Sequence, residues 1–168
     1  MTIAASDFRS YVINPALAAM ASAGIPVTKT AADLLMATAA METDLGTWLT
    51  QVGGPALGVF QIEPPSLDTL VSRLSTKQIT ALFSVMPAPP AAAEMSGWVA
   101  GNIEGNLLLA AAICRLFYWQ APFAMPVAST VSGLWTVYKT WYNTAEGGAT
   151  MPDFVTALKL TDLAELPA

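Results

Sequence analysis

Glu42 stands out among the residues that can carry chemistry, because of its place in a predicted helix. Apolar residues at helical spacing predict a helix over Ala31–Met41, and Glu42 follows Leu35 by seven residues, almost two full turns. The carboxyl is therefore expected on the buried face and at the helix C-terminus, where the macrodipole disfavours negative charge. Both placements favour the protonated form that a general acid requires. The alternative is an exposed helix-end residue that begins a solvated loop.

The amino-acid composition excludes most other classes of functional site. The 168 residues include no His and one Cys, Cys114, so we expect no His-dependent nucleophile, no metal, no cofactor and no internal disulfide. Seven Lys and Arg against 12 Asp and Glu give a net charge of −5, and this balance provides no basic stripe for nucleic acid. Carboxylate chemistry or binding remains.

The residues after Glu42 carry a resemblance to a known family. Residues 55–64 read PALGVFQIEP, which is similar to the Gly-Ala-x-Gly-Leu-Met-Gln-Ile-x-Pro motif of the lytic transglycosylases, a family of the lysozyme-like superfamily with bacteriophage members. Pro55 and Phe60 depart from the motif. Glu42-Thr43 resembles the Glu-Ser that ends a helix in that family. The matching positions of the longer motif are Gly58, Gln61 and Pro64.

Two further matches follow in the same order along the chain. Asn102, ahead of an apolar run to Leu116, looks like the third family motif, an Asn at the start of a long buried helix. Tyr142-Asn143 looks like the Tyr-Asn of the fourth motif, although Thr144 follows where the family has Ala-Gly. The four motifs together make this chain similar to a bacteriophage lytic transglycosylase.

The resemblance implies a mechanism with a single carboxyl group. Glu42 would protonate the β-1,4 glycosidic oxygen between N-acetylmuramic acid and N-acetylglucosamine in peptidoglycan. The resulting carboxylate would take the proton of the muramyl 6-hydroxyl, which closes to a 1,6-anhydro sugar because it is already positioned. Peptidoglycan strands are the implied partner, with virion proteins as further candidates.

The resemblance also implies a set of residues that bind the glycan. Gly58 would let the backbone approach a sugar ring. Gln61 could donate to and accept from the sugar, or instead cap loop backbone. Tyr142 would hold the Glu42 carboxyl through its hydroxyl, unless it is plain core. The full substrate-binding set is Thr43, Gly58, Gln61, Glu63, Tyr142 and Asn143, with Trp48, Trp98 and Trp141 as aromatic residues that could stack on sugars.

Two other functions remain open at this stage. A hydrolytic muramidase would need a second carboxylate across the cleft, and Glu63 can enter the cleft if Gln61 does, because alternate residues of an extended segment face one side. The other candidates for that carboxylate are Asp44, Asp68 and Glu104. A non-catalytic virion structural or glycan-binding module on the same fold is the second alternative.

These motifs must be positioned by helices. The length indicates one domain over 1–168, and the turn signals predict an all-α fold, or one with a minimal β element at Gly58–Ile62, with a lysozyme-like glycan cleft. Asn14, Thr30 with Asp33, Ser66 and Ser75 are the predicted caps. Thr43–Pro65 is a predicted loop and Pro87–Pro90 a break. The other predicted helices cover Ser6–Ile13, 14–24, Ser66–Leu74, Thr76–Val85, Asn102–Trp119, Ser129–Tyr142 and Thr150–Leu160.

High apolar content raises the question of a membrane. Apolar residues make up 54% of the chain, but Pro, Gly and Asn interrupt its longest uncharged stretches, so we expect no membrane span. Asp7, Arg9 and Asn14-Pro15 disfavour a signal peptide. With the resemblance, this predicts a protein of the phage virion or of the infected bacterial cytoplasm that acts on the periplasmic cell wall.

Overall fold

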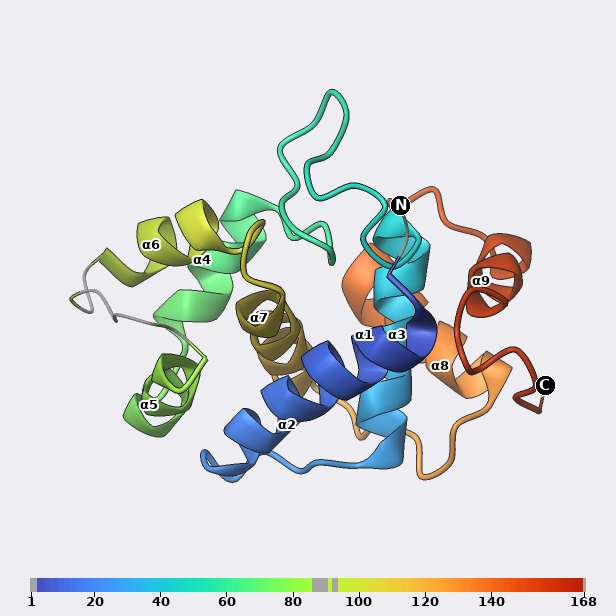
Figure 1. The fold of residues 1–168 in the computed structure, drawn as a ribbon, viewed down its shortest axis with the longest axis horizontal. Coiled ribbons are helices and arrows are strands. Elements are labelled where there is room, and N and C mark those ends of the chain that lie inside the picture. Colours follow the sequence, from blue (N-terminus) through green and yellow to red (C-terminus); the bar gives the residue numbers. More distant parts are fainter. Residues whose placement is uncertain (1–2, 86–90, 92–93, 168) are drawn as a thin grey trace.

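The fold is all-α, with a long helix near its centre and shorter helices on both sides (Figure 1). The computed structural model describes residues 3–85, 91 and 94–167. Helix α7 packs against α2 and α3, while α3 also contacts α8 and α9, and α4 contacts α6. The elements are α1 Ala5–Phe8, η1 Arg9–Ile13, α2 Asn14–Ala21, α3 Lys29–Thr43, α4 Pro64–Ser72, α5 Thr76–Phe83, α6 Met95–Asn102, α7 Leu107–Trp119, α8 Val131–Val137, η3 Tyr138–Asn143 and α9 Met151–Leu158.

The N-terminal segment is one continuous helical run, and the predicted cap at Asn14 is wrong. Helix α1 passes through the π-helical turn η1 into α2, and Asn14 has helical φ and ψ of −63° and −45°. The Asn14 N–H reaches back to the carbonyl of Arg9, as the wide turn requires. The next residue, Pro15, has no N–H to place. The helix therefore continues through a sequence that reads as a start signal.

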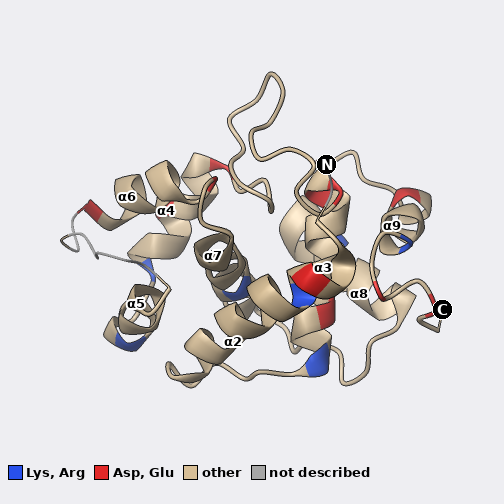
Figure 2. Cartoon of the chain, viewed as in Figure 1, with Lys and Arg blue, Asp and Glu red and all other residues tan. Residues whose placement is uncertain are grey.

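The N-cap of helix α3 lies two residues before the predicted one. Thr28 is the N-cap, and its Oγ1 accepts a hydrogen bond from the Ala31 N–H at 3.1 Å. Thr30 is buried inside the helix, so the predicted cap of Thr30 with Asp33 is wrong. Asp33 instead accepts hydrogen bonds from Arg9, Lys29 and Ser129. Figure 2 shows these charges gathered near the start of α3.

Helix α7 is the buried central helix that the sequence predicts, but it starts at a different asparagine. The run from Leu109 to Leu116 is buried throughout. The side chain of Asn106 caps α7 by accepting from the Leu109 N–H at 3.0 Å. Asn102 instead ends α6, where its amide donates to the carbonyl of Trp98. The predicted start at Asn102 is therefore wrong, because residues 102–106 form a separate turn.

The remaining predicted helices occur in the expected order with shifted ends, whereas helix α6, Met95–Asn102, was not predicted from the sequence. The capping box of Ser75 with Gln78 is present at the start of α5. Helix α4 begins at Pro64 and not at a Ser66 cap, since prolines are well suited to the first helical positions. The predicted helix over Ser129–Tyr142 is α8 followed by the π-helical η3. The predicted break at Pro87–Pro90 lies outside the described residues.

In the described part of the chain, no helix has the length and apolar character needed to cross a membrane.

The predicted loop between α3 and α4 projects from the helices (Figure 1). Isolated bridges join Leu57 to Thr50 and to Ile62, so the predicted strand at Gly58–Ile62 is reduced to a single bridge residue. Gly58 is buried with φ of +71°, and a Cβ there would lie 2.8 Å from the carbonyl oxygen of Ile103. The glycine thus allows the loop to approach the end of α6, which differs from its expected approach to a sugar.

A comparison of Gly24 with Gly58 distinguishes the cost of backbone strain from the cost of a steric clash, because both glycines have positive φ. Gly58→Ala and Gly24→Ala each place a Cβ at positive φ, but among the described residues no atom beyond the chain neighbours lies within 4 Å of the Cβ position at Gly24. We expect Gly24→Ala to lower the free energy of unfolding by about 1–2 kcal/mol and Gly58→Ala to cost about 1–3 kcal/mol more. Urea denaturation measures both, and equal losses would contradict the close contact with Ile103.

Candidate active site

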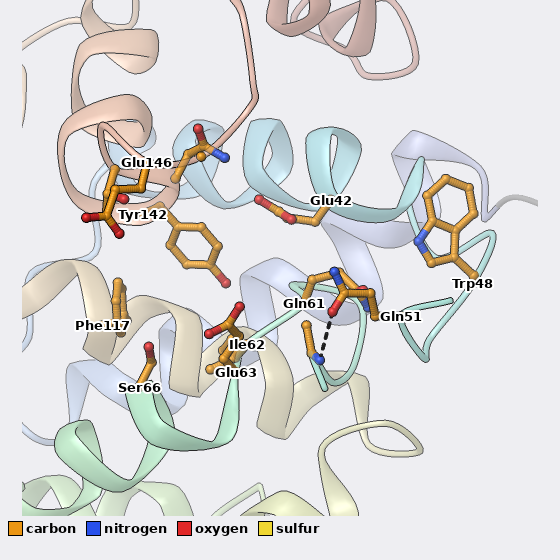
Figure 3. Close-up of a pocket in the computed structure, with 14 residues that line it drawn as sticks. Glu42, Trp48, Gln51, Gln61, Ile62, Glu63, Ser66, Phe117, Tyr142 and Glu146 are labelled. Atoms are coloured by element: carbon orange, nitrogen blue, oxygen red, sulfur yellow. Dashed lines mark hydrogen bonds between the residues drawn. The ribbon is translucent and has the colours of Figure 1, made fainter. Parts of the chain in front are cut away.

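Glu42 faces a cavity of about 650 Å³ formed by segments that are distant in sequence (Figure 3). The end of α3, the projecting loop, the start of α4, one residue of α7 and the end of η3 form its walls. The lining residues are Glu42, Trp48, Gln51, Ala56, Gln61, Ile62, Glu63, Ser66, Phe117, Tyr142, Asn143, Thr144, Glu146 and Gly147.

Thr43 explains why Glu42 lies at the last turn of α3. Its hydroxyl donates to the carbonyl of Val59 at 2.8 Å and accepts from the Gly46 N–H at 3.0 Å. Asp44 and Leu45 then adopt left-handed conformations, which end the helix. Thr43 is fully buried and is not among the cavity-lining residues. The structure thus places it as a tie between helix and loop and not, as expected, beside the substrate.

The Glu42 carboxyl lies in surroundings that favour its protonated form. The side chain is largely buried, and burial raises its pKa from 4.5 to about 7. The Tyr138 hydroxyl donates a hydrogen bond of 2.8 Å to Glu42 Oε1, which partly offsets this rise. None of the ion pairs found among the described residues includes Glu42. The carboxyl can therefore hold or release a proton near neutral pH.

Tyr138, and not Tyr142, is the tyrosine that holds Glu42. The prediction that the Tyr142 hydroxyl bonds to the carboxyl is wrong, because that hydroxyl donates to the carbonyl of Phe60 at 2.5 Å. The two phenol rings stack with centroids 6.0 Å apart. Both lie on η3, one turn apart, so the rotation of this π-helical segment decides which hydroxyl reaches α3. The sequence did not single out Tyr138.

The other predicted binding residues divide into two groups. Gln61, Glu63 and Asn143 line the cavity with Glu42, whereas Gly58 is not among the lining residues. Gln61 has φ of +47°, and its amide donates to the Gly58 carbonyl at 2.8 Å, so it supports loop backbone while still lining the cavity. Asn143 accepts from the Lys139 ammonium at 2.7 Å. Glu63 is exposed at the N-cap of α4 without a side-chain cap bond.

The three predicted tryptophans lie in different places. Trp48 is 40% exposed and lines the cavity at the end that it shares with Gln51 (Figure 3). Trp141 lines a second cavity next to the first. Trp98, on α6, packs against the hydrophobic core and lines neither cavity.

Of the other carboxylates proposed from sequence, none lines the cavity. Asp68 accepts a hydrogen bond from Ser96, and Glu104 accepts one from Thr50. Asp44 turns away at the left-handed end of α3. Glu146, which the sequence did not single out, lines the cavity because the chain returns past Tyr142 after η3. Its only sequence signal was its nearness to the Tyr-Asn pair.

Phe117 and Thr144 complete the wall beside Tyr142. Phe117 comes from α7 and meets the Tyr142 ring edge-on, with centroids 5.3 Å apart. Thr144 has φ of +61° and ψ of 177°, an unusual conformation for a β-branched residue. Such strain is found at ligand sites more often than elsewhere. In the described part of the chain, no three His, Cys, Asp or Glu residues are grouped to hold a metal ion.

Comparisons of the chain with protein-family models, with curated proteins and with solved structures find no match.

The buried carboxyl predicts a pH-dependent stability difference. Unfolded Glu42 ionises near pH 4.5, whereas the folded form keeps its proton up to about 7. The unfolded state therefore binds fewer protons in this window, and rising pH destabilises the wild type relative to Glu42→Gln by a total of about 3 kcal/mol. Urea denaturation at pH 4 and pH 8 measures the change. Glu63→Gln removes an exposed carboxylate of the same cavity, and an equal pH-dependent gap there would contradict the effect of burial.

Tyr138 and Tyr142 should differ in their effect on Glu42. Tyr138→Phe removes the hydrogen bond that favours the carboxylate, so the pKa of Glu42 should rise further, by the equivalent of roughly 1–3 kcal/mol. Tyr142→Phe removes the bond to Phe60 instead and should leave the Glu42 titration in place. Carbon-13 NMR of the Glu42 carboxyl reports both values, and a larger shift in the Tyr142 variant would reverse the assignment.

Proposed function

We propose that this protein is a peptidoglycan lytic transglycosylase in which Glu42 is the general acid and base. The observation that carries the proposal is the largely buried Glu42 carboxyl, with a pKa of about 7, facing a cavity of about 650 Å³. The ordered motifs from Glu42 to Asn143 resemble those of that family. Both features require the same residue in the same role.

The geometry supports a two-step use of one proton site. Protonated Glu42 donates to the glycosidic oxygen as the bond to the muramyl anomeric carbon breaks, and it becomes a carboxylate. The muramyl 6-hydroxyl then attacks that carbon, and Glu42 takes its proton, which restores the starting acid and yields the 1,6-anhydro product. Tyr138 favours the carboxylate formed between these steps, because its hydroxyl donates to Glu42 Oε1.

The character of the cavity suits a sugar chain. Carboxylates, amides and hydroxyls from Gln51, Gln61, Glu63 and Ser66 offer partners for sugar hydroxyls and acetamido groups. Aromatic side chains stand at both ends, with Trp48 at one and Phe117 at the other (Figure 3). Aromatic faces between polar groups are a common arrangement in small-molecule and glycan sites.

Glu42→Gln tests the catalytic role. General acid–base catalysis contributes about 10²–10⁴ in rate, so the variant should clear purified peptidoglycan at least a hundredfold more slowly while remaining folded. Wild-type activity should also fall as the pH rises through about 7, because the acid form is lost. Glu165→Gln, which removes an exposed carboxylate that does not line the cavity, is the control. Clearance by the Glu42→Gln variant at the wild-type rate would leave a non-catalytic glycan-binding or virion structural module.

A hydrolytic muramidase is the second candidate, and Glu63 and Glu146 favour it because they add two carboxylates to the same cavity. Either would have to activate water, which an inverting enzyme does with carboxyls about 6.5–9.5 Å apart. We expect 1,6-anhydromuramyl ends, because the motif resemblance is to transglycosylases. Mass spectrometry of digested strands decides the product. Free reducing muramic acid, with a matching loss of activity in Glu63→Gln or Glu146→Gln, would establish hydrolysis.

We further propose that the protein is phage-encoded and reaches the bacterial wall from the virion or during lysis. The support is the similarity of the Glu42-Thr43, 55–64 and Tyr142-Asn143 segments to motifs of the family's bacteriophage members. Mass spectrometry of purified particles separates the two routes, because a lysis protein is absent from the virion.

A further inference from the structure

A second cavity, of about 480 Å³, continues the first beyond Phe117. Ser66, Phe117 and Thr144 line both cavities, so the two share a boundary between α4, the end of α7 and η3. In Figure 3, Ser66 and Phe117 lie at the end of the first cavity opposite Trp48. A ligand that extends along the first cavity past Glu42 therefore reaches the second.

The two cavities differ in charge and polarity. The charged residues that line the first are acidic: Glu42, Glu63 and Glu146. The second is lined by Leu70, Phe117 and Trp141 together with hydroxyl and amide side chains, and its one charged residue is Arg73, at the C-terminal end of α4. Among the described residues, no hydrogen bond or ion pair of the Arg73 guanidinium is found, and the side chain is exposed. It is thus available to a carboxylate.

The walls of the second cavity are held in place before any ligand arrives. The Trp141 indole N–H donates to the carbonyl of Phe117 at 2.8 Å, and its ring packs against Phe123 with centroids 6.2 Å apart. On the opposite side, the Gln120 amide donates to the carbonyl of Leu70 at 3.3 Å. A preformed site lowers the cost of ordering side chains on binding.

We propose that the second cavity binds the peptide stem of the glycan strand whose sugars occupy the Glu42 cavity. This inference rests on the proposed function. A stem of small aliphatic residues with free carboxylates matches both features of the site, because its methyl groups can pack on Leu70 and Trp141 and a carboxylate can pair with Arg73. The acidic first cavity would repel the carboxylates of such a stem, so the substrate binds with its stem in the second cavity and its sugars in the first.

Binding to a protein that does not cleave tests the proposal. In the Glu42→Gln background, calorimetric titrations compare a muramyl disaccharide that bears its peptide with the same disaccharide without it. We expect the peptide to strengthen binding, and Arg73→Gln to weaken binding of the peptide-bearing ligand by about three- to tenfold while leaving the bare disaccharide unchanged. Amidation of the stem carboxylates should have the same effect as Arg73→Gln.

Lys77→Gln is the control, because Lys77 is also an exposed cation but lines neither cavity. If the disaccharide binds but Arg73→Gln does not distinguish the two ligands, the peptide site is overturned and the proposed function stands. If neither ligand binds and the wild type does not cleave peptidoglycan, both fall together. If Lys77→Gln weakens binding as much as Arg73→Gln does, the loss reflects the net charge of the protein and the peptide site is also overturned.

Discussion

The buried carboxylate of Asp33 is the constraint on which the position of α3 depends. It is fully buried, and it receives hydrogen bonds from Arg9 at 2.9 Å, Lys29 at 2.5 Å and Ser129 at 2.6 Å. Arg9 also pairs with Asp162 near the C-terminus, so one cluster ties the N-terminal helix, α3, the segment before α8 and the end of the chain. A buried charge that loses one partner costs several kcal/mol. This cluster therefore restricts how α3 can shift or rotate.

Helix α3 carries a second, largely buried carboxyl at its other end, and the contrast between the two is the basis of the proposed chemistry. Asp33 lies near the helix N-terminus with cations beside it, where a negative charge is favoured. Glu42 lies at the C-terminal end, largely buried, with a neutral hydroxyl from Tyr138 as its partner. The same helix thus pairs one carboxylate, Asp33, with cations and holds the other, Glu42, where burial disfavours its ionised form. Ionisation of Glu42 destabilises the folded protein, and a destabilising group of this kind is typical of a functional residue rather than a structural one.

The cavity around Glu42 is built from irregular backbone held by specific bonds. Thr43 joins α3 to the projecting loop through Val59, and Tyr142 joins η3 to the same loop through Phe60. The π-helical turn of η3 lets two tyrosines one turn apart contact different partners. These ties hold the loop against α3 and η3. Ser66, Phe117 and Thr144 form the boundary between the acidic cavity and the second cavity with its single arginine. Because the two adjoining cavities differ in charge, we expect a substrate whose two parts, a sugar chain and a peptide stem, differ in the same way.

Local patterns determined the helical class, the loop after α3, the burial of Glu42 and the central helix, because periodicity and capping act over a few residues. They also identified Ser75 as a cap. Tertiary structure decided the rest. Which tyrosine reaches Glu42 depends on how η3 is rotated against α3, and the need for Gly58 comes from the carbonyl of Ile103. The second cavity exists because α4, α7 and η3 meet. These contacts join residues far apart in the chain, and no local preference encodes the rotation and separation of packed elements.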